Sequence, residues 1–371
     1  MSTVKKAELS LETKLNQASV RERVKDLLSG KAIFPWAIEL DPTTVCNLAC
    51  HDCISANLVN HGAFERARIK DLAREFKEMG VRAVVLIGGG EPMAHPEFGT
   101  IVDYFYDNDI HVGVTSNGTL IERYLDRLAE KTKWVRISVD AGSDEMYKEF
   151  RPSKSGKSMW NTVIEGMRKL GARKKCKLGY SFLVLSKSDD NGNVIKSNVS
   201  DIIKAAHVAK EIGCDYFEVK PSFDMMHFLV NHSAEVHGFV SKQLKEIMHL
   251  EDDNFRIISP YTLNEALTGS ATQEKGYHRC LTTNLRTVVT PSGVYVCPYF
   301  RGNLNMRLGD ANKQSMEHIW KSDLRKSVMR RLNPTIHCTF HCIRHKSNLL
   351  LEKWAAEGMP EEFLADYDLF I

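Results

Sequence analysis

Three cysteines near the amino end have a spacing suited to metal chemistry. Cys46, Cys50 and Cys53 form a Cys-x3-Cys-x2-Cys motif, expected by chance only about 0.005 times in a chain with this cysteine content. Three thiolates close in sequence can bind three irons of a four-iron cluster and leave the fourth iron without a protein ligand. Another molecule can bind there, so the motif predicts a catalytic cluster. A zinc site completed by His51 or by a distant residue is the alternative.

Four further cysteines lie in the last quarter of the chain. They are Cys280, Cys297, Cys338 and Cys342. Four thiolates saturate either a tetrahedral zinc ion or a complete four-iron cluster, so this quartet is interpreted as structural, as electron-carrying, or as both. The two remaining cysteines, Cys176 and Cys214, stand alone beside apolar stretches and are interpreted as small buried hydrophobic residues.

Composition and charge limit the class of protein. The 371 residues include 50 basic and 47 acidic side chains, a net charge of +3, and 43% are hydrophobic. This composition is typical of a globular protein, and the balanced charge does not favour a nucleic-acid partner or an anionic membrane. The sequence has no run of about 18 apolar residues and no secretory signal. We therefore expect a cytoplasmic protein with reduced thiols, without a membrane or nucleic-acid partner.

Alternating strands and helices are predicted to position the cysteines. Strands are expected at residues 36–40, 81–87, 111–115, 134–139, 177–185 and 216–219, and helices at 69–79, 98–106, 120–131, 160–170 and 199–212. This alternation indicates a parallel sheet with right-handed crossovers. Six strands are too few for a closed eight-stranded barrel. The predicted fold class is therefore α/β, a partial (β/α)6 barrel followed by a small C-terminal α+β domain.

The chain is expected to divide into five regions. They are a helical extension at 1–34, the partial barrel at 35–222, a helical bridge at 223–270, a cysteine-bearing region at 271–345 and a closing helix at 346–371. The cysteine-bearing region has short strands at 287–290 and 294–296 and little core of its own. A metal centre is therefore expected to stabilise it.

Glycines and a carboxylate follow the second predicted strand. In parallel barrels, the loops at the carboxyl ends of the strands gather around the active site. In Gly88-Gly89-Gly90-Glu91-Pro92, the glycines let the backbone approach a ligand closely, and Glu91 can accept hydrogen bonds from an amino group. A flexible turn into the next helix is the alternative.

Polar residues follow the third, fourth and sixth strands as well. Asn117 can bind a ligand or cap a helix. Strand alternation would place Ser138 and Asp140 on one face, where they could bind the hydroxyl groups of a ribose. Lys220 is the candidate catalytic residue that touches the substrate, although a lysine at a strand end can also be merely solvated. The Met-rich and aromatic segment at 222–228 either lines the substrate pocket or belongs to the core.

Taken together, these motifs resemble the radical S-adenosylmethionine (SAM) enzyme superfamily over about residues 35–220. The resemblance implies that the first three cysteines hold a 4Fe-4S cluster whose open iron is chelated by the amino and carboxylate groups of SAM. It implies that one-electron reduction yields a 5′-deoxyadenosyl radical, which abstracts a hydrogen atom from the substrate. The residues expected to bind SAM are Gly89, Gly90, Glu91 and Pro92 for the amino group, Ser138 and Asp140 for the ribose, and Asn117 as a further candidate. The chain departs from the family at Asp52, where an aromatic residue commonly packs on the adenine.

The C-terminal cysteines resemble the shortened auxiliary-cluster extension of that superfamily, the twitch or SPASM-like domain. The match runs in the order Cys280, a hairpin at Gly293, Cys297, Cys338 and Cys342, with one residue fewer than usual between the glycine and the second cysteine. This resemblance implies a second, auxiliary 4Fe-4S cluster that transfers electrons. It also implies an external one-electron reductant of the flavodoxin or ferredoxin type.

The expected substrate is a small molecule. Only 45 residues precede Cys46, which leaves little room for the leader-binding domain of many peptide-modifying relatives. We therefore expect an oxidoreductase or epimerase that acts on a sugar, an aminocyclitol or a nucleoside. The alternatives are a peptide or protein maturase of the same superfamily, acting on ribosomal peptides or resembling sulfatase maturases, and a non-catalytic iron-sulfur or zinc-binding protein.

Overall fold

The computed structural model describes residues 11–191, 193–223, 232–268 and 274–371. In these ranges one continuous sheet has the strand order β12-β11-β10-β1-β2-β3-β4-β5-β8-β9, and β6 (Ser186–Ser188) and β7 (Val194–Ser197) form a separate hairpin. The strands of the large sheet are β1 (Ala37–Leu40), β2 (Ala83–Leu86), β3 (His111–Ser116), β4 (Trp134–Ser138), β5 (Lys177–Val184), β8 (Tyr216–Pro221), β9 (Arg256–Ile258), β10 (Arg286–Thr290), β11 (Gly293–Tyr295) and β12 (Arg307–Gly309).

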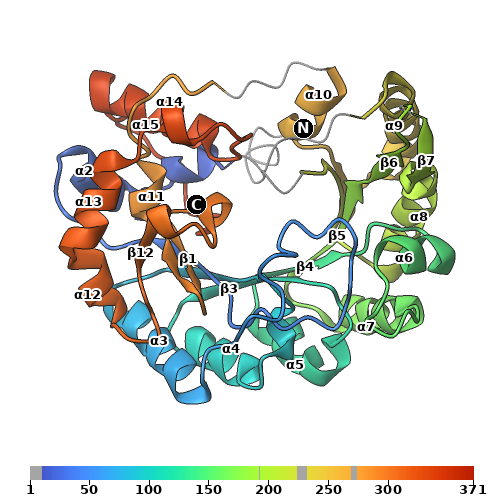
Figure 1. Ribbon diagram of the computed structural model, residues 1–371, viewed down its shortest axis with the longest axis horizontal. Coiled ribbons are helices and arrows are strands. Elements are labelled where there is room, and N and C mark those ends of the chain that lie inside the picture. The colour runs from blue at the N-terminus through green and yellow to red at the C-terminus, as the bar shows by residue number, and fades with distance from the viewer. Residues whose placement is uncertain (1–10, 192, 224–231, 269–273) are drawn as a thin grey trace.

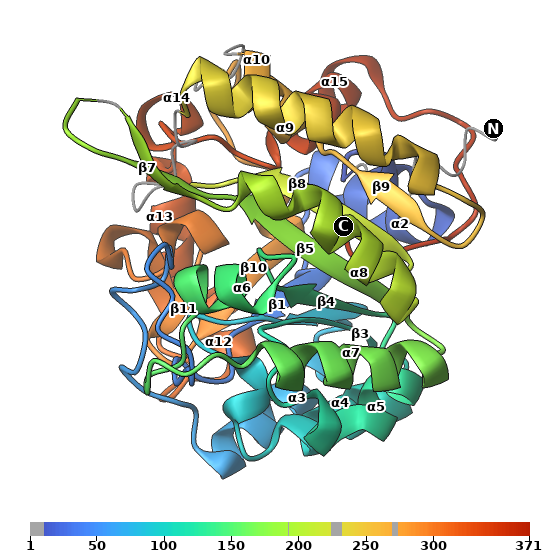
Figure 2. The same cartoon turned by 90° about the vertical axis from the view of Figure 1, so that its right-hand side faces the viewer.

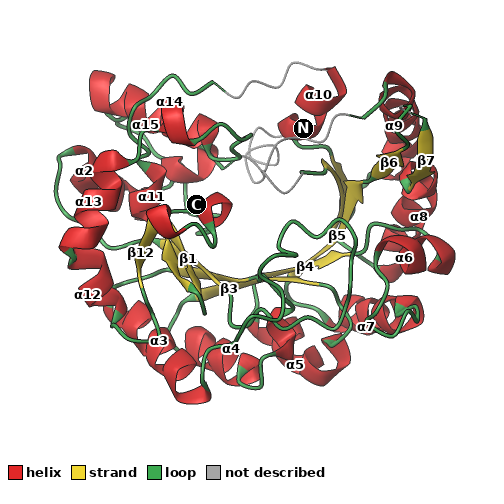
Figure 3. Ribbon diagram, in the orientation of Figure 1, coloured by secondary structure: helices red, strands yellow, loops and turns green. Residues whose placement is uncertain are grey.

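Helices connect the successive parallel strands and cover the outer side of the sheet. They are α3 (Arg66–Glu78), α4 (Phe98–Asp107), α5 (Leu125–Lys131), α7 (Trp160–Arg173) and α8 (Ile202–Ile212). The sheet curves into an arc with these helices outside it (Figures 1 and 3). The predicted α/β class and the partial barrel with six alternating strands are therefore confirmed.

Hydrophobic periodicity explains how the sheet and its helices pack. In α3, Ile69, Leu72 and Phe76 recur on one face and are fully buried against the sheet. Strands β1 and β2 are buried at every position, as expected for parallel strands covered on both faces. Cys176 and Cys214 are buried in the same core, as predicted from their apolar surroundings.

Two glycines leave room for aromatic rings on the inner face of the arc. A Cβ atom on Gly113 would lie 2.2 Å from the ring of Trp134, and one on Gly179 would lie 2.1 Å from the ring of Tyr216. The strand register pairs the same residues, Gly113 with Trp134 and Gly179 with Tyr216. The two rings therefore lie across the neighbouring strands near their amino ends, where they close the inner face.

The last residues of the chain reach the same inner face. The ring centroids of Phe370 and Trp134 are 5.3 Å apart, and Trp36 Nε1 donates to the carbonyl oxygen of Leu369 at 3.0 Å. The C label lies inside the arc in Figure 1. The prediction of a closing helix over 346–371 is therefore only partly right. Helix α15 (His345–Glu357) ends at Gly358, whose φ of +91° does not continue a helix, and no helix follows it.

The N-terminal extension packs beside this segment. A 3-10 turn, η1 (Thr13–Asn16), and helix α2 (Ala18–Leu28) form it within the described residues. Their apolar side chains form a second core with the C-terminal residues and with the inner-face side chains of β1 and β2. The alternate side chains of the same two strands pack against the outer helices.

The two regions after the barrel contain more sheet than predicted. The bridge at 223–270 holds α9 (Ala234–Ile247), which packs against α8 (Figure 2), and α10 (Tyr261–Thr268), but also strand β9, which pairs in parallel with β8. Strand β10 of the cysteine-bearing region pairs in parallel with β1. That region therefore extends the barrel sheet, because three short strands bury their faces more fully on an existing sheet than alone. Helices α6 (Asp144–Phe150), α12 (Met316–Lys321) and α13 (Asp323–Arg331) and the β6–β7 hairpin were not predicted.

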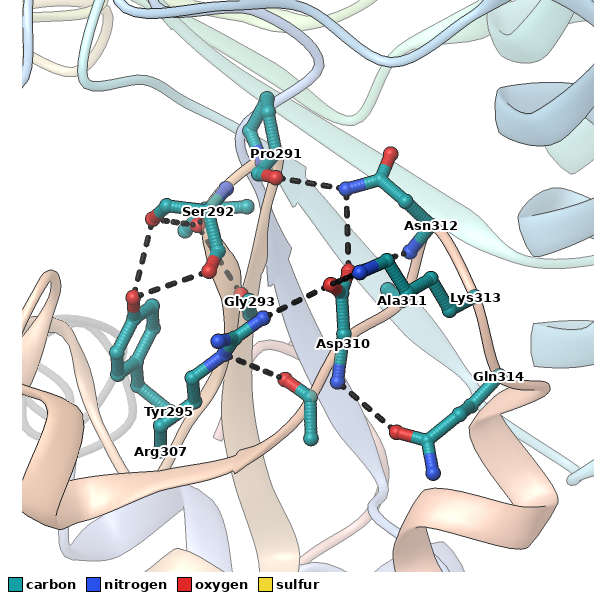
Figure 4. A network of polar contacts seen from close by, with 12 residues as sticks. Pro291, Ser292, Gly293, Tyr295, Arg307, Asp310, Ala311, Asn312, Lys313 and Gln314 are labelled. Atoms are coloured by element: carbon teal, nitrogen blue, oxygen red, sulfur yellow. Dashed lines mark hydrogen bonds and ion pairs between the residues drawn. The ribbon is translucent and has the colours of Figure 1, made fainter.

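The hairpin between β10 and β11 requires glycine at its turn. Gly293 has a φ of +147°, and a Cβ atom there would lie 2.4 Å from Arg307 Nε. Arg307 donates from Nε to the carbonyl oxygen of Gly309 and pairs with Asp310 at 3.0 Å, as Figure 4 shows. Asn312 Nδ2 donates to the carbonyl oxygen of Pro291 at 2.7 Å. These contacts hold the turn that leads into Cys297.

No helix in the described part of the chain has the length and apolar character needed to cross a bilayer.

The contact between Gly113 and Trp134 makes a prediction about stability. Gly113→Ala places a methyl group against a buried ring and should lower the free energy of unfolding of the metal-free chain by about 1–3 kcal/mol, measured by urea denaturation. Gly238→Ala is the matched control, because a Cβ there meets no atom within 4 Å in helix α9 and should raise stability by about 0.5–1 kcal/mol. Equal effects of the two substitutions would contradict the packing described for Trp134.

Candidate functional site

The loop after β1 brings the first three cysteines together. Burial raises the pKa of Cys46, and it raises the pKa of Cys50 to about 11, while the negative charges of neighbouring thiolates add to both shifts. Asn117 Nδ2 donates to Cys46 Sγ and Arg151 Nη1 donates to Cys50 Sγ, each at 3.9 Å. Thiols in this setting lose their protons when a cation binds, and the donors stabilise the resulting thiolates.

Contacts with two other strand ends fix this loop. Asn47 Nδ2 donates to Thr119 Oγ1 at 2.7 Å, and Asn47 Oδ1 accepts from Asn117 Nδ2 at 2.9 Å. The Ala49 backbone N–H donates to the carbonyl oxygen of Pro152 at 2.8 Å. The cysteine loop is thereby attached to the segment after β3 and to the segment after α6.

The predicted glycine loop lies directly against the chain that enters the cysteine loop. A Cβ atom on Gly90 would lie 2.4 Å from the backbone of Thr44, so only glycine fits. The backbone N–H of Gly89 donates to Asp41 Oδ2 at 3.1 Å, and that of Glu91 donates to the carbonyl oxygen of Val45 at 2.9 Å. The loop after β2 and the cysteine loop therefore share one rigid backbone surface.

Glu91 uses its carboxylate to join the ends of β2 and β3. It accepts hydrogen bonds from Ser116 Oγ at 2.9 Å and from the backbone N–H groups of Asn117 and Met93 at 2.7 and 3.0 Å. Burial raises the pKa of Glu91 to about 7, although these donors act in the opposite direction. The predicted residues Glu91 and Asn117 thus lie side by side next to Cys46.

Asp140 lies beyond the end of the strand that contains Ser138, so strand alternation does not extend to it. Strand β4 ends at Ser138, and Asp140 has a φ of +56° that turns the chain toward α6. Both carboxylate oxygens of Asp140 have protein partners, because Oδ1 accepts from the Leu183 backbone N–H at 2.7 Å and Oδ2 is ion-paired with Arg151. Arg151 was not singled out in the sequence, where it is one arginine among many. Its role emerges only when α6 folds back toward the cysteine loop.

Lys220 lies on the inner face of the arc with two charged neighbours. Its Nζ is 3.4 Å from Glu218 Oε2, which is 3.5 Å from Arg136 Nη1. Burial lowers the pKa of Lys220, and the nearby positive charge of Arg136 lowers it further. All three side chains are partly exposed toward the interior of the arc. Arg136 and Glu218 escaped sequence analysis because single charged residues within strands carry no distinctive pattern. Of the segment at 222–228, residues 224–228 lie outside the described part of the chain.

The four C-terminal cysteines line one cavity of about 50 Å³. Burial raises the pKa of Cys342 to about 12 and the pKa values of Cys297 and Cys338 as well, and the four thiols influence one another electrostatically. Cys280 Sγ accepts from Asn348 Nδ2 at 3.5 Å. The backbone N–H groups of the residues two positions after Cys297 and Cys342 also donate to those thiols. Three of the four sulfur atoms therefore accept hydrogen bonds from nearby donors.

The donor sets fit clusters better than single ions. Among the described residues, no three His, Cys, Asp or Glu side chains converge on the position of one metal ion. A tetrahedral zinc ion needs its sulfur ligands at about 2.3 Å, whereas a four-iron cluster spaces its thiolates more widely. Thiols that share a cavity and accept N–H···S hydrogen bonds suit the larger group. Both cysteine groups are therefore compatible with the predicted 4Fe-4S clusters, and the zinc alternative fits less well.

A buried ion pair joins the two cysteine regions. Arg301 Nε is 2.6 Å from Asp41 Oδ2, and Arg301 Nη2 donates to Asp41 Oδ1 at 3.1 Å. Asp41 is fully buried, and burial raises its pKa to about 6 despite the guanidinium. Arg301 follows Cys297 by one short turn, and Asp41 also holds Gly89. Neither residue was predicted, because they are 260 positions apart.

Residues 40–190 match the family model of the Radical SAM superfamily. Over 310 residues the chain is 23% identical to mycofactocin maturase MftC from Mycobacterium tuberculosis, an alignment that covers 80% of this chain and 72% of that protein. It is 26% identical over 325 residues to the AdoMet-dependent heme synthase of Methanosarcina barkeri, with 80% of this chain and 84% of that protein covered.

The fold is similar to that of SuiB from Streptococcus suis, solved with the precursor peptide SuiA. The TM-score is 0.61 at 18% identity, with 84% of this chain and 70% of that chain covered. Residues 40–190 therefore form a Radical SAM domain, and the resemblance predicted from the sequence is confirmed. Its predicted cofactors, SAM with a 4Fe-4S cluster and an auxiliary 4Fe-4S cluster, are confirmed for this class of protein.

The predicted substrate is wrong. A sugar, aminocyclitol or nucleoside was expected because few residues precede Cys46. The two relatives named above are instead a mycofactocin maturase and a heme synthase, and a similar structure holds a precursor peptide. The number of residues before a motif is a weak guide to the substrate, because peptide contacts can come from any part of the fold.

The Asp41–Arg301 pair makes a prediction about stability and its pH dependence. Arg301→Met leaves a buried carboxylate unpaired and should lower the free energy of unfolding of the metal-free chain by about 3–5 kcal/mol. The pKa of Asp41, about 6, lies above the unfolded value of about 4, so this group's stabilisation is lost as pH rises through 6. Without Arg301 the pKa of Asp41 rises further. The free energy of unfolding that Arg301→Met loses relative to the wild type should therefore grow between about pH 5 and about pH 8. Urea denaturation across that range measures both effects.

Lys321→Met is the matched control for this prediction. Lys321 pairs with Glu317 at 2.6 Å on the exposed surface of α12. Loss of this ion pair should lower the free energy of unfolding by no more than about 0.5 kcal/mol at any pH in the range. The prediction is contradicted if Arg301→Met loses no more unfolding free energy than Lys321→Met, or if its loss shrinks as pH rises. Either result would show that Arg301 does not stabilise the Asp41 carboxylate.

Proposed function

We propose that this chain is a peptide maturase, a radical SAM enzyme that oxidises a residue of a peptide substrate. The observation that carries the proposal is the extent of the similarity to the mycofactocin maturase. It spans 310 residues, whereas the radical SAM model matches only 40–190, so it continues into the regions outside that domain. The likeness of the fold to a structure that holds a precursor peptide agrees with this proposal.

In this proposal, each group of predicted site residues has one task. The ligands of the two clusters are Cys46, Cys50 and Cys53 for the first and Cys280, Cys297, Cys338 and Cys342 for the second. The SAM-binding residues are Gly89, Gly90, Glu91, Pro92, Asn117, Ser138 and Asp140. When bound, these cofactors supply one-electron transfer and hydrogen-atom abstraction. Glu91 orients the loop backbone for SAM, and Asp140 acts through Arg151, which it holds beside Cys50.

The inner face of the arc is the proposed place for the reacting peptide residue. Lys220, Glu218 and Arg136 supply charged groups there, and the rings of Trp134 and Tyr216 close the amino end of the strands against water. We assign Lys220 to contact with the peptide. An external flavodoxin or ferredoxin would supply electrons. The nine free thiols favour a reducing compartment such as the cytoplasm.

Heme synthesis is a second candidate. It is favoured by one observation, the 26% identity to a heme synthase of which 84% is covered. The peptide reaction is preferred because the mycofactocin maturase and the peptide-bound fold both agree with it. Incubation with a heme precursor in place of the peptide, followed by absorption spectroscopy, separates the two candidates.

Replacement of the two cysteine groups should have different effects. The triple substitution of Cys46, Cys50 and Cys53 by Ala should lower the iron content of the anaerobically reconstituted protein from about eight to about four per chain. The triple substitution should also abolish formation of 5′-deoxyadenosine, because SAM then has no cluster iron to bind. Changing Cys280 and Cys297 to Ala should leave about four irons and measurable 5′-deoxyadenosine but remove peptide product.

Cys176→Ala is the matched control for the cysteine variants. Cys176 is buried in the core and does not line the cavity of the C-terminal cysteines, and its replacement should leave about eight irons per chain. Wild-type protein that binds zinc and no iron would refute the cofactor assignment. Full peptide turnover by the Cys280 and Cys297 variant would refute a role of the second site in the reaction.

The substrate class can be tested directly with synthetic peptides. The probes are the short peptides encoded beside the gene, incubated anaerobically with reconstituted enzyme, SAM and dithionite. Mass spectrometry should show a peptide that has lost two hydrogen atoms, with 5′-deoxyadenosine formed in proportion. Scrambled peptides of the same composition are the control. Conversion of a heme precursor, with no change in any peptide, would overturn the proposal in favour of the second candidate.

A further inference from the structure

Arg344 lines the cavity that the four C-terminal cysteines share. It lies two residues after Cys342, immediately before α15, and its backbone N–H donates to the Cys342 thiol. Its side-chain charge interacts electrostatically with the same thiol and with Glu39. The guanidinium thus lies within electrostatic reach of the Cys342 thiol in this cavity.

The Arg344 guanidinium has no ion-pair or hydrogen-bond partner among the residues that the structure describes. Burial lowers the pKa of Arg344 to about 9, and the nearby charge of Arg286 acts in the same direction. The Arg344 side chain is half-buried, and a partly desolvated guanidinium is stabilised when an anion faces it. The neighbouring Arg286 does have an anion, because it pairs with Glu39 at 2.7 Å and donates to the carbonyl oxygen of Ile371 at 2.8 Å. Of the two arginines that line this cavity, Arg344 is therefore the one that forms no ion pair with a described residue.

The first cysteine group differs in this respect. Arg151 donates to Cys50 Sγ, but its charge is matched by the ion pair with Asp140. Each site therefore has an arginine beside a cysteine, but Arg344, unlike Arg151, forms no ion pair with a described residue. This contrast indicates that the C-terminal cavity is built for an occupant with more negative charge to compensate.

We propose that Arg344 is the counter-charge of the auxiliary cluster and makes its reduction potential less negative. The inference rests on the proposed assignment of the four cysteines as ligands. A four-iron cluster with four thiolates is anionic, and its negative charge grows by one when it accepts one electron from an external donor. A fixed cation beside it stabilises the reduced form more than the oxidised form. The auxiliary site thereby becomes a better electron acceptor than the first site, whose arginine is neutralised by Asp140.

The test is a redox titration of the reconstituted holoenzyme with dithionite, followed by EPR spectroscopy. In Arg344→Gln, the midpoint potential of the auxiliary cluster should move to a more negative value, while that of the first cluster stays unchanged. Arg344→Lys keeps the charge and should give a smaller shift. Lys353→Gln is the matched control, because it removes one positive charge from the exposed surface of α15 and should shift neither cluster.

Iron content separates failure of this inference from failure of the proposed function. About eight irons per chain with an unchanged auxiliary potential in Arg344→Gln would overturn the role of Arg344 alone. About four irons in the wild-type protein would overturn the cluster assignment on which it rests. If Arg344→Gln does not retain the auxiliary cluster, the midpoint potential of the auxiliary cluster is measured in Glu39→Gln instead. Loss of that nearby carboxylate should move the auxiliary potential to a less negative value, and an unchanged or more negative value would overturn the inference.

Discussion

The buried ion pair between Asp41 and Arg301 connects the two halves of the active region. Asp41 continues from β1 toward the first cysteine loop and also receives the backbone N–H of Gly89, while Arg301 closes the turn after Cys297. One carboxylate therefore sets the relative position of the glycine loop and of the auxiliary cysteines. Since both partners are removed from water, neither can move without exposing an unpaired charge to an apolar surrounding. This constraint holds two distant cysteine groups in one rigid arrangement.

The continuous sheet supports the same arrangement. Strand β10 pairs in parallel with β1, so the auxiliary region shares the hydrogen-bond ladder that also carries the first cysteine loop. The C-terminal residues close the inner face near Trp134, and Trp134 and Tyr216 lie across glycines of the neighbouring strands. A shared sheet with a packed inner face keeps the two cysteine groups at a fixed separation.

Local sequence patterns predicted the class of enzyme and its cofactors but not its substrate. The motifs predicted the class of enzyme and its cofactors, because metal ligation and SAM binding require particular side chains at short spacings. The substrate was mispredicted from the number of residues before Cys46. Charged side chains that converge across the sheet, such as Arg136 and Glu218, have no signature in one sequence. Only similarity to proteins such as the mycofactocin maturase corrected that interpretation.

The sequence by itself determined the α/β alternation, the six barrel strands, the glycine loop and the two groups of cysteines. Each of these depends on interactions between near neighbours, so that hydrophobic period, glycine and cysteine spacing are sufficient to find it. Tertiary structure alone decided the partners of the charged residues, including Arg151 with Asp140 and Arg301 with Asp41, and left Arg344 without an ion pair to a described residue. It also decided that β9 and β10 extend the barrel sheet. The physical reason is that ion pairing and strand pairing act between residues far apart in the chain, where only the folded backbone specifies which groups meet.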